Sequence, residues 1–341
     1  MKRSLLLAEF SNTIWALHPA ALAKLSSVLN RWQSGIPASA EIMAQIASDK
    51  AARTERLEML ASEFVTFDAA TPRRGQSSGG AIAVLPLYGI IAQRGNMADD
   101  VSGPGSCSLQ SFTQSFRQAM ADDTVSQILI DIDSPGGSVY GVGELATEIM
   151  KARGIKPVIG VSNSLCASAG YWIGSACSEF YCTPNGELGS IGVYTAHADM
   201  SAALEQDGVK MTLISAGDFK TEGNPYGPLT DEALAAIQGS VDAYYAMFTS
   251  SVAKGRGVQV AAVRDGMGKG RCLMAADALS AGMIDGVMSF DDVVAKMRKG
   301  AKPARGAMSA NADGLPALVP AANPERAKAK TTLAGLSLML N

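Results

Sequence analysis

One serine sits among residues that suit covalent catalysis. Ser168 lies in "CASAG", where Ala167, Ala169 and Gly170 leave its hydroxyl unobstructed. A helix that begins there would place its positive end beside the hydroxyl, where it favours negative charge. The same small residues also suit close packing of a helix against a sheet. Ser168 is therefore a candidate nucleophile, with a packing role as the alternative.

A glycine turn precedes this serine. The sequence "SPGG", residues 134–137, directly follows an apolar strand and exposes the backbone amides of Gly136 and Gly137. Two N–H groups aimed at one point form an oxyanion hole, and the amide of Ala169 would point to the same oxygen. The turn alone is also an ordinary strand–helix connection. An aspartic protease is not expected, because it would need a second loop that carries an Asp in a setting like that of Asp133, and the sequence has none.

A serine nucleophile needs a base, and the chain has two histidines. His18 lies in the N-terminal segment ahead of a proline, where a surface or packing role is expected. His197 follows Ser168 by 29 residues. Asp199 or Asp218 could orient it, so a Ser-His-Asp triad is one interpretation.

A lysine is the other candidate base. Lys220 lies in "SAGDFKTEGNPYGPLT", between a predicted strand and a long predicted helix. A lysine is protonated at neutral pH and acts as a base only when its surroundings remove it from water. Phe219, Tyr226 and two prolines could shield it. Spacing alone does not decide between His197 and Lys220.

The elements around these residues alternate between strand and helix, which predicts an α/β domain with a largely parallel sheet. We expect strands at 81–91, 126–133, 156–162 and 209–215. Helices are expected at 108–122, 141–153 and 229–257, and one more is expected to begin near residue 166. Thr230 is the predicted N-cap of the last helix.

The regions on either side of this domain differ in composition. Residues 1–76 are predicted to form an N-terminal helical extension, with helices at 19–33 and 52–64 and a linker rich in Pro, Gly and Ser. The α/β domain would occupy 77–300. Residues 301–341, dominated by Ala, Pro, Asn and Lys, are predicted to be a flexible tail.

Composition excludes several classes of function. The net charge of −3 leaves no basic footprint for nucleic acid. The five cysteines form no C-x-x-C pair and are typical of a reduced cytosolic protein. Glu9 interrupts the apolar start, and no apolar run is long enough to cross a membrane. We therefore expect a cytoplasmic protein without membrane association, metal or cofactor.

Four motifs in order, "SPGG", "CASAGYWI", "GSIGV" and "AGDFKTEGNPYGPLT", resemble the signal peptide peptidase A family of serine proteases with the Clp/crotonase-type fold. The resemblance covers about residues 81–290. It implies a Ser–Lys dyad, with Ser168 as nucleophile and Lys220 as general base. Ser190 would orient the lysine. It also implies that a sheet flanked by helices carries the site and that the subunits assemble into a ring-type homo-oligomer.

The same resemblance implies an oxyanion hole made by the amides of Gly136 or Gly137 and of Ala169. Within the family, the chain looks most similar to head-maturation proteases of lambda-type phages, through "IAVLPLYGII", "SIGVYTAHADM" and the N-terminal extension. A serine endopeptidase that processes capsid or scaffold proteins is expected, acting in the host cytoplasm or in the phage prohead. Its substrates would be proteins or peptides.

Alternatives remain open at this point. A bacterial protease of the signal-peptide-peptidase type, degrading peptides or unfolded proteins, is the nearest one. A catalytically silent protein associated with the scaffold is another. A crotonase-like acyl-CoA enzyme would share the glycine turn, but the expected basic cluster for CoA phosphates is missing. Only about 40 residues follow the domain, so a scaffolding region in the same chain is not expected. The role of His197 is left open.

Overall fold

The structure is a computed structural model, and it describes residues 13–21, 26–27, 36–37, 39–67, 72–73, 80–94 and 106–300. The chain divides into two units, Met1–Gly306 and Ala307–Asn341. The second unit lies outside the described residues, as does the whole tail predicted at 301–341. Most of the helix predicted at 19–33 lies outside them as well.

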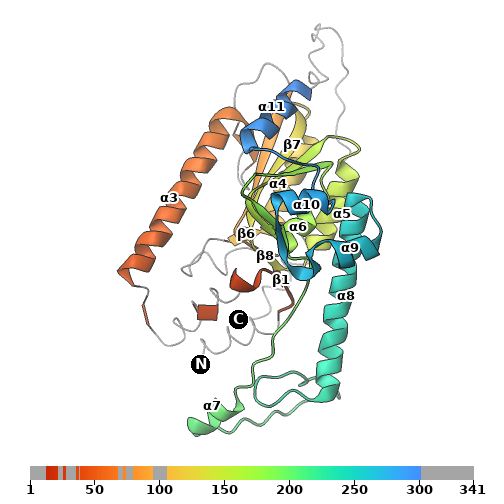
Figure 1. Cartoon of the computed structure of the whole chain (residues 1–341). Coiled ribbons are helices and arrows are strands. Elements are labelled where there is room, and N and C mark those ends of the chain that lie inside the picture. The colour runs from red at the N-terminus through yellow and green to blue at the C-terminus, as the bar shows by residue number, and fades with distance from the viewer. Residues whose placement is uncertain are drawn as a thin grey trace, which may run out of the picture. The chain divides into compact units, whose positions relative to one another are not determined.

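A nine-stranded sheet forms the centre of the first unit (Figure 1). Its main path runs β12-β11-β9-β7-β4-β2-β3, and β10 joins it by pairing with β9 and β13. All of its strand pairs are parallel except β11–β12 and β2–β3. The strands are β2 (Val65–Phe67), β3 (Pro72–Arg73), β4 (Ala81–Tyr88), β7 (Val125–Ser134), β9 (Val158–Ala167), β10 (Glu179–Cys182), β11 (Glu187–Gly189), β12 (Cys272–Met274) and β13 (Gly286–Val287). The predicted α/β class with a largely parallel sheet is confirmed.

The central strand β7 is buried on both faces, as its apolar composition requires. Ile128, Ile130 and Ile132 enter one hydrophobic cluster, and Leu129 enters the other. Successive side chains of a strand point to opposite faces, so this alternation places a separate core on each side of the sheet.

Helices cover both faces. The larger cluster is completed by α4 (Leu109–Ala121), α5 (Val142–Ala152), α6 (Ala169–Gly174), α8 (Asp231–Arg256), α9 (Val260–Gly266) and α10 (Ala275–Ser280). The smaller cluster is completed by α3 (Ala40–Glu63) and α11 (Phe290–Gly300), through residues such as Leu60 and Val293. The predicted arrangement of a sheet flanked by helices is therefore present. A 3-10 helix at Gly268–Gly270 follows α9.

A second, four-stranded sheet lies in the order β1-β8-β5-β6. Its strands are β1 (Trp15–Leu17), β5 (Ile90–Ala92), β6 (Ser106–Ser108) and β8 (Gly136–Ser138). The N-terminal extension was expected to be helical, and α3 agrees with the helix predicted at 52–64. The extension also contributes β1 and β2, which pair with strands of the α/β domain. It is thus built into the two sheets.

The long helix α8 begins at its predicted cap, because the Thr230 side chain accepts a hydrogen bond from the Ala233 amide. Its C-terminal half buries Phe248, Thr249, Val252 and Ala253, and Phe248 stacks on Trp172 of α6 with ring centroids 4.5 Å apart. Residues 196–230, which we call the arm, precede it and include α7 (Ser201–Gln206). Figure 1 shows α7 and the following loop at the N-terminal end of α8, away from the sheets.

The strand predicted at 209–215 is wrong. These residues pair with no strand in the described part of the chain, and residues 207–220 are all exposed. Ile214 is 95% exposed, and Val209, Met211 and Phe219 are exposed with it. The alternating apolar pattern suits a strand, but here no second strand offers hydrogen bonds. An exposed apolar surface of this kind typically marks a contact with another molecule.

An ion pair fixes the C-terminal end of α8. Arg256 donates two hydrogen bonds to the Asp285 carboxylate, each 2.9 Å, and the Phe180 amide donates a third of 2.7 Å. Burial alone would raise the pKa of Asp285, but these hydrogen bonds outweigh it and hold the pKa below its usual value. The stabilisation is present at neutral pH and is lost as pH falls through the lowered pKa.

We predict that Asp285→Asn lowers the free energy of unfolding at pH 7 by about 1 kcal/mol, because solvent partly screens this half-exposed pair. The difference from wild type should shrink at an acidic pH below the lowered pKa of the folded-state carboxylate, where the group is protonated in both the folded and the unfolded state. Urea unfolding at both pH values measures it. Asp265→Asn, at an exposed position, is the control. An equal deficit at both pH values would contradict the account.

Candidate active site

Ser168 lies at the junction of a strand and a helix, directly after β9 and before α6. Its backbone has φ 54° and ψ −115°, a conformation that costs a residue with a side chain of the order of 1–3 kcal/mol. The Ser168 amide donates to the Gly189 carbonyl over 2.7 Å, and its own carbonyl accepts from Trp172 over 2.9 Å. These two bonds hold the strained junction in place.

The glycine turn lies against this serine. Gly136 has φ +96°, and a Cβ added to it would lie 2.9 Å from the Ser168 Cβ and 3.0 Å from the Ala167 carbonyl oxygen. Only glycine permits so close an approach. The Gly136 amide donates to the Ser134 hydroxyl over 3.1 Å, and that hydroxyl donates to the Gly89 carbonyl over 2.7 Å. The structure thus brings the "SPGG" turn to Ser168, as the sequence predicts.

The other predicted oxyanion donors are close by. Gly137 lies in β8, opposite Ala16 of β1 and Ile91 of β5. Ala169 is the first residue of α6, and an amide at that position has no acceptor within its own helix. Both residues are buried.

Ser190 also has a positive φ, of 52°, and is buried. It follows Gly189, the residue whose carbonyl accepts from the Ser168 amide, so it lies beside the candidate nucleophile. Its own amide donates to the backbone carbonyl of Arg271 over 2.9 Å. Among the described non-glycine residues, positive φ values occur at Ser168, Ser190 and Lys269. Two of these three belong to the predicted site, which fits the tendency of backbone strain to gather where function requires it.

The structure does not bring Lys220 to Ser168. The lysine lies in the exposed arm, and its side chain forms no hydrogen bond or ion pair within the described chain. The Ser168 hydroxyl donates instead to the Gly192 carbonyl over 3.4 Å. His197 is not at Ser168 either, since its Nε2 lies 3.0 Å from the carbonyl oxygen of Asn224 in the arm.

Cys166 is a nearby thiol that does not compete as nucleophile. It is fully buried at the end of β9, and burial raises its pKa well above the usual value, which disfavours the reactive thiolate. All five cysteines are free thiols, as expected.

A strand that the sequence did not predict lies beside the glycine turn next to Ser168. Strand β1 pairs with β8 in antiparallel fashion, and Trp15 forms a bridge with Tyr194. The segment "TIWAL", residues 13–17, which ends with this strand, is rich in β-branched and aromatic residues, and this was the available signal. The hydrogen bonds of the Ser134 hydroxyl to Gly89 and Gly136 were not predicted either, although Ser134 is the first residue of "SPGG".

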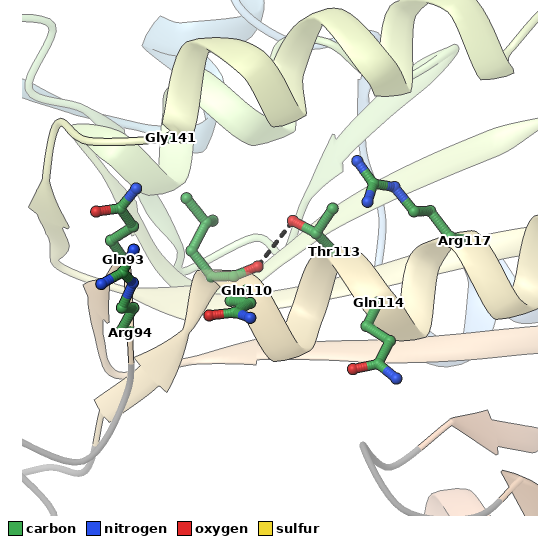
Figure 2. A pocket seen from close by; sticks show the side chains of 8 residues that line it. Gln93, Arg94, Gln110, Thr113, Gln114, Arg117 and Gly141 are labelled. Carbon is green, nitrogen blue, oxygen red and sulfur yellow. Dashed lines mark hydrogen bonds between the residues drawn. The ribbon is translucent and has the colours of Figure 1, made fainter. Parts of the chain in front are cut away.

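Two open cavities among the described residues lie elsewhere. Figure 2 shows one of about 470 Å³, lined by Gln93 and Arg94 after β5 and by α4 residues that include Gln110 and Arg117. A larger one, of about 960 Å³, lies where α5 and α8 meet, with Tyr140 and Tyr244 in its lining. Neither is lined by Ser168, which is 1% exposed.

Among the residues that the structure describes, no group of three or more His, Cys, Asp or Glu side chains is arranged to hold a metal ion. No helix among them is both long and apolar enough to cross a membrane.

Comparison with known proteins finds one matching family. The model of peptidase family S49 matches residues 151–303, which include Ser168, Ser190 and Lys220. The chain is related to the S49 peptidases. The sequence resemblance is thereby confirmed, and the α/β architecture is consistent with an S49 peptidase fold.

Individual relatives include phage and bacterial proteins. The chain is 35% identical to the capsid assembly protease C of Escherichia phage lambda, over 71% of this chain and 54% of the relative. It is 34% identical to the head-tail preconnector protein GP5 of Enterobacteria phage P21, over 63% and 42%. It is 29% identical to protease 4 of Salmonella typhi, over 66% of this chain and 35% of the relative. The chain thus spans about half the length, or less, of these S49 relatives.

We predict that Gly136→Ala lowers peptidase activity at least about 100-fold, because the methyl group would collide with the Ala16 carbonyl oxygen and the Ser168 side chain and displace the amides that are predicted to form the oxyanion hole. The initial rate of cleavage of an unfolded protein measures it. Gly282→Ala is a matched control, since Gly282 also has a positive φ, of +71°, but open space around its Cα. Comparable activity in both variants would contradict a role for the turn.

Proposed function

We propose that this chain is a serine endopeptidase in which Ser168 is the nucleophile and Lys220 the general base. The observation that carries the proposal is the strained backbone of Ser168, held 2.7 Å from the Gly189 carbonyl and packed against Gly136. Relationship to the S49 peptidases supports the reaction type.

The proposed reaction assigns a step to each of these residues. Neutral Lys220 takes the proton from the Ser168 hydroxyl as its oxygen attacks the peptide carbonyl. Amides at Gly136–Gly137 and at Ala169 stabilise the negative oxygen of the tetrahedral intermediate. The protonated lysine then gives its proton to the leaving amine, and water attacks the acyl-enzyme with Lys220 as base again. The Ser190 hydroxyl orients the lysine.

Lys220 reaches Ser168 through assembly of a homo-oligomer. The lysine lies on the exposed arm, whereas Ser168 is buried beside the sheet. The arm also exposes Val209, Met211 and Ile214, which a neighbouring subunit would cover. We therefore propose that the arm of one subunit supplies Lys220 to Ser168 of the next in a ring-type assembly.

Capsid or scaffold proteins of a phage are the proposed substrates, and the host cytoplasm or the phage prohead is the proposed place of action. The similarity to capsid assembly protease C of phage lambda supports this choice. The similarity to protease 4 of Salmonella typhi favours a second candidate, a bacterial protease that degrades peptides or unfolded proteins. Both functions would use the same dyad.

Single substitutions test the dyad. Ser168→Ala and Lys220→Ala should each lower the cleavage rate of an unfolded protein at least about 1,000-fold, because each removes a group that the attack requires. His197→Ala should keep most of the activity, since the histidine contacts the arm at Asn224. An inactive His197→Ala together with an active Lys220→Ala would refute the assignment.

A mixing experiment tests assembly across subunits. Ser168→Ala and Lys220→Ala are combined after dissociation and reassembly. If the arm acts on its neighbour, about a quarter of the sites in a random mixture carry both intact groups, and activity returns to that fraction. If each chain supplies its own lysine, the mixture stays inactive. That result would contradict the proposed exchange of arms.

A further inference from the structure

We propose that strand β1 lies in the peptide-binding groove as an internal substrate, and that the bond between Ala16 and Leu17 is the first bond this enzyme cleaves. The inference rests on the proposed function and adds to it the site of self-processing and the state of the groove before activation.

The first support is the hydrogen-bond pattern on one side of the strand. The Val139 amide donates to the Ile14 carbonyl over 3.3 Å, and the His18 amide donates to the Pro135 carbonyl over 2.7 Å. Between these two bonds, the register sets Ala16 opposite Gly137. Residues 14, 16 and 18 therefore face the edge of β8 that continues from the "SPGG" turn.

The second support is the pattern on the other side. The Trp15 amide donates to the Tyr194 carbonyl over 2.8 Å, and the Tyr194 amide donates to the Trp15 carbonyl over 3.0 Å. The Thr195 hydroxyl adds a bond of 3.0 Å to the carbonyl of Thr13. Alternate residues thus bond to opposite walls, which is how an extended peptide binds between two strands.

The third support is the position of one carbonyl group. A Cβ placed on Gly136 would lie 2.2 Å from the carbonyl oxygen of Ala16 and 2.9 Å from the Ser168 Cβ. The Ala16 carbonyl and the Ser168 side chain therefore flank the same point of the glycine turn. The Ala16 carbonyl oxygen is the heavy atom nearest to that point, which singles out the Ala16–Leu17 bond.

Burial shows that the groove is filled. Ala16 and Leu17 are 0% and 1% exposed, and Ser168 is 1% exposed. A second peptide has no access to Ser168 while β1 stays in place. Since Lys220 does not contact Ser168 in this chain, β1 remains uncut until assembly supplies the base.

The step is a hydrolysis. The Ser168 oxygen bonds to the Ala16 carbonyl carbon while its proton passes to Lys220. The bond from Ala16 to the Leu17 nitrogen breaks, and the lysine proton goes to that amine. Water then attacks the ester, releasing the Ala16 carboxylate and restoring the Ser168 hydroxyl. The products are a fragment of residues 1–16 and a chain that begins at Leu17.

The direct test is the N-terminus of the assembled full-length protein, read by intact mass and N-terminal sequencing. Wild type should begin at Leu17, and Ser168→Ala should retain residues 1–16. Cleavage of an unfolded reporter protein is followed in the same samples. If wild type cleaves the reporter but keeps residues 1–16, or is cut elsewhere within 13–18, the inference is wrong while the proposed function stands.

A second test reads the groove without catalysis. In the Ser168→Ala background, Ala16→Glu should expel β1, because a buried charge is costly. Amide hydrogen exchange of Val139 and Tyr194 should accelerate at least about tenfold. Ala20→Glu, at an exposed position just past the strand, is the matched control and should leave the exchange unchanged. Circular dichroism confirms that both variants fold.

Hydrogen exchange and cleavage together distinguish failure of the inference about β1 from failure of the proposed function. Equal exchange in both variants would show that β1 does not fill the groove, and the inference falls. If exchange accelerates as expected but wild type cleaves neither the reporter nor itself, the proposed function fails and the cleavage step fails with it. In active protein, Ala16→Glu should abolish cleavage after position 16 and cleave the reporter without a lag.

Discussion

The left-handed backbone of Ser168 is the constraint on which the candidate site depends. A serine with φ 54° is stable only where its surroundings hold it, and here the Gly189 carbonyl and the start of α6 do so. Helix α6 is itself fixed, since Trp172 stacks on Phe248 and the Tyr171 hydroxyl donates to the Met283 carbonyl over 3.0 Å. The strain turns the serine toward the glycine turn.

The nucleophile and the proposed base belong to parts of the chain with different physical character. Ser168 is set in a close-packed core, where neighbours fix its geometry. Lys220 is carried by an exposed arm, on which the apolar side chains of Val209, Met211 and Ile214 are also exposed. Such a division would couple proteolysis to assembly. The core of one subunit positions the serine, but the base reaches it only when a neighbouring subunit binds.

The occupied groove would add a second level of control. A protease that assembles among its own substrates risks premature cleavage, and a strand seated over the nucleophile delays it. Strand β1 pairs with β8 on one side and forms a bridge with Tyr194 on the other. Its removal would therefore expose hydrogen-bonding groups on both sides, which another extended peptide could bind. Extended segments with a small residue at the position of Ala16 would fit that groove best.

Much of the fold and part of the site could be predicted from the sequence. The alternation of strands and helices predicts the sheet, because β7 and its neighbours are apolar enough to be buried on both faces. "SPGG" and "CASAG" predict the approach of Gly136 to Ser168, since only small residues allow it. The strand predicted at 209–215 failed because an alternating pattern does not show whether a partner strand exists. Strand β1 was missed because three residues give too short a pattern, and its partners lie more than 100 residues away.

The reaction of Ser168 with a serine-directed phosphonate tests the central claim most directly. Peptide mass mapping of the assembled protein should locate the adduct on Ser168. Labelling should be lost in Ser168→Ala and strongly slowed in Lys220→Ala, because the lysine must accept the serine proton. An adduct on another residue, or labelling of Ser168 at an unchanged rate in Lys220→Ala, would contradict the account.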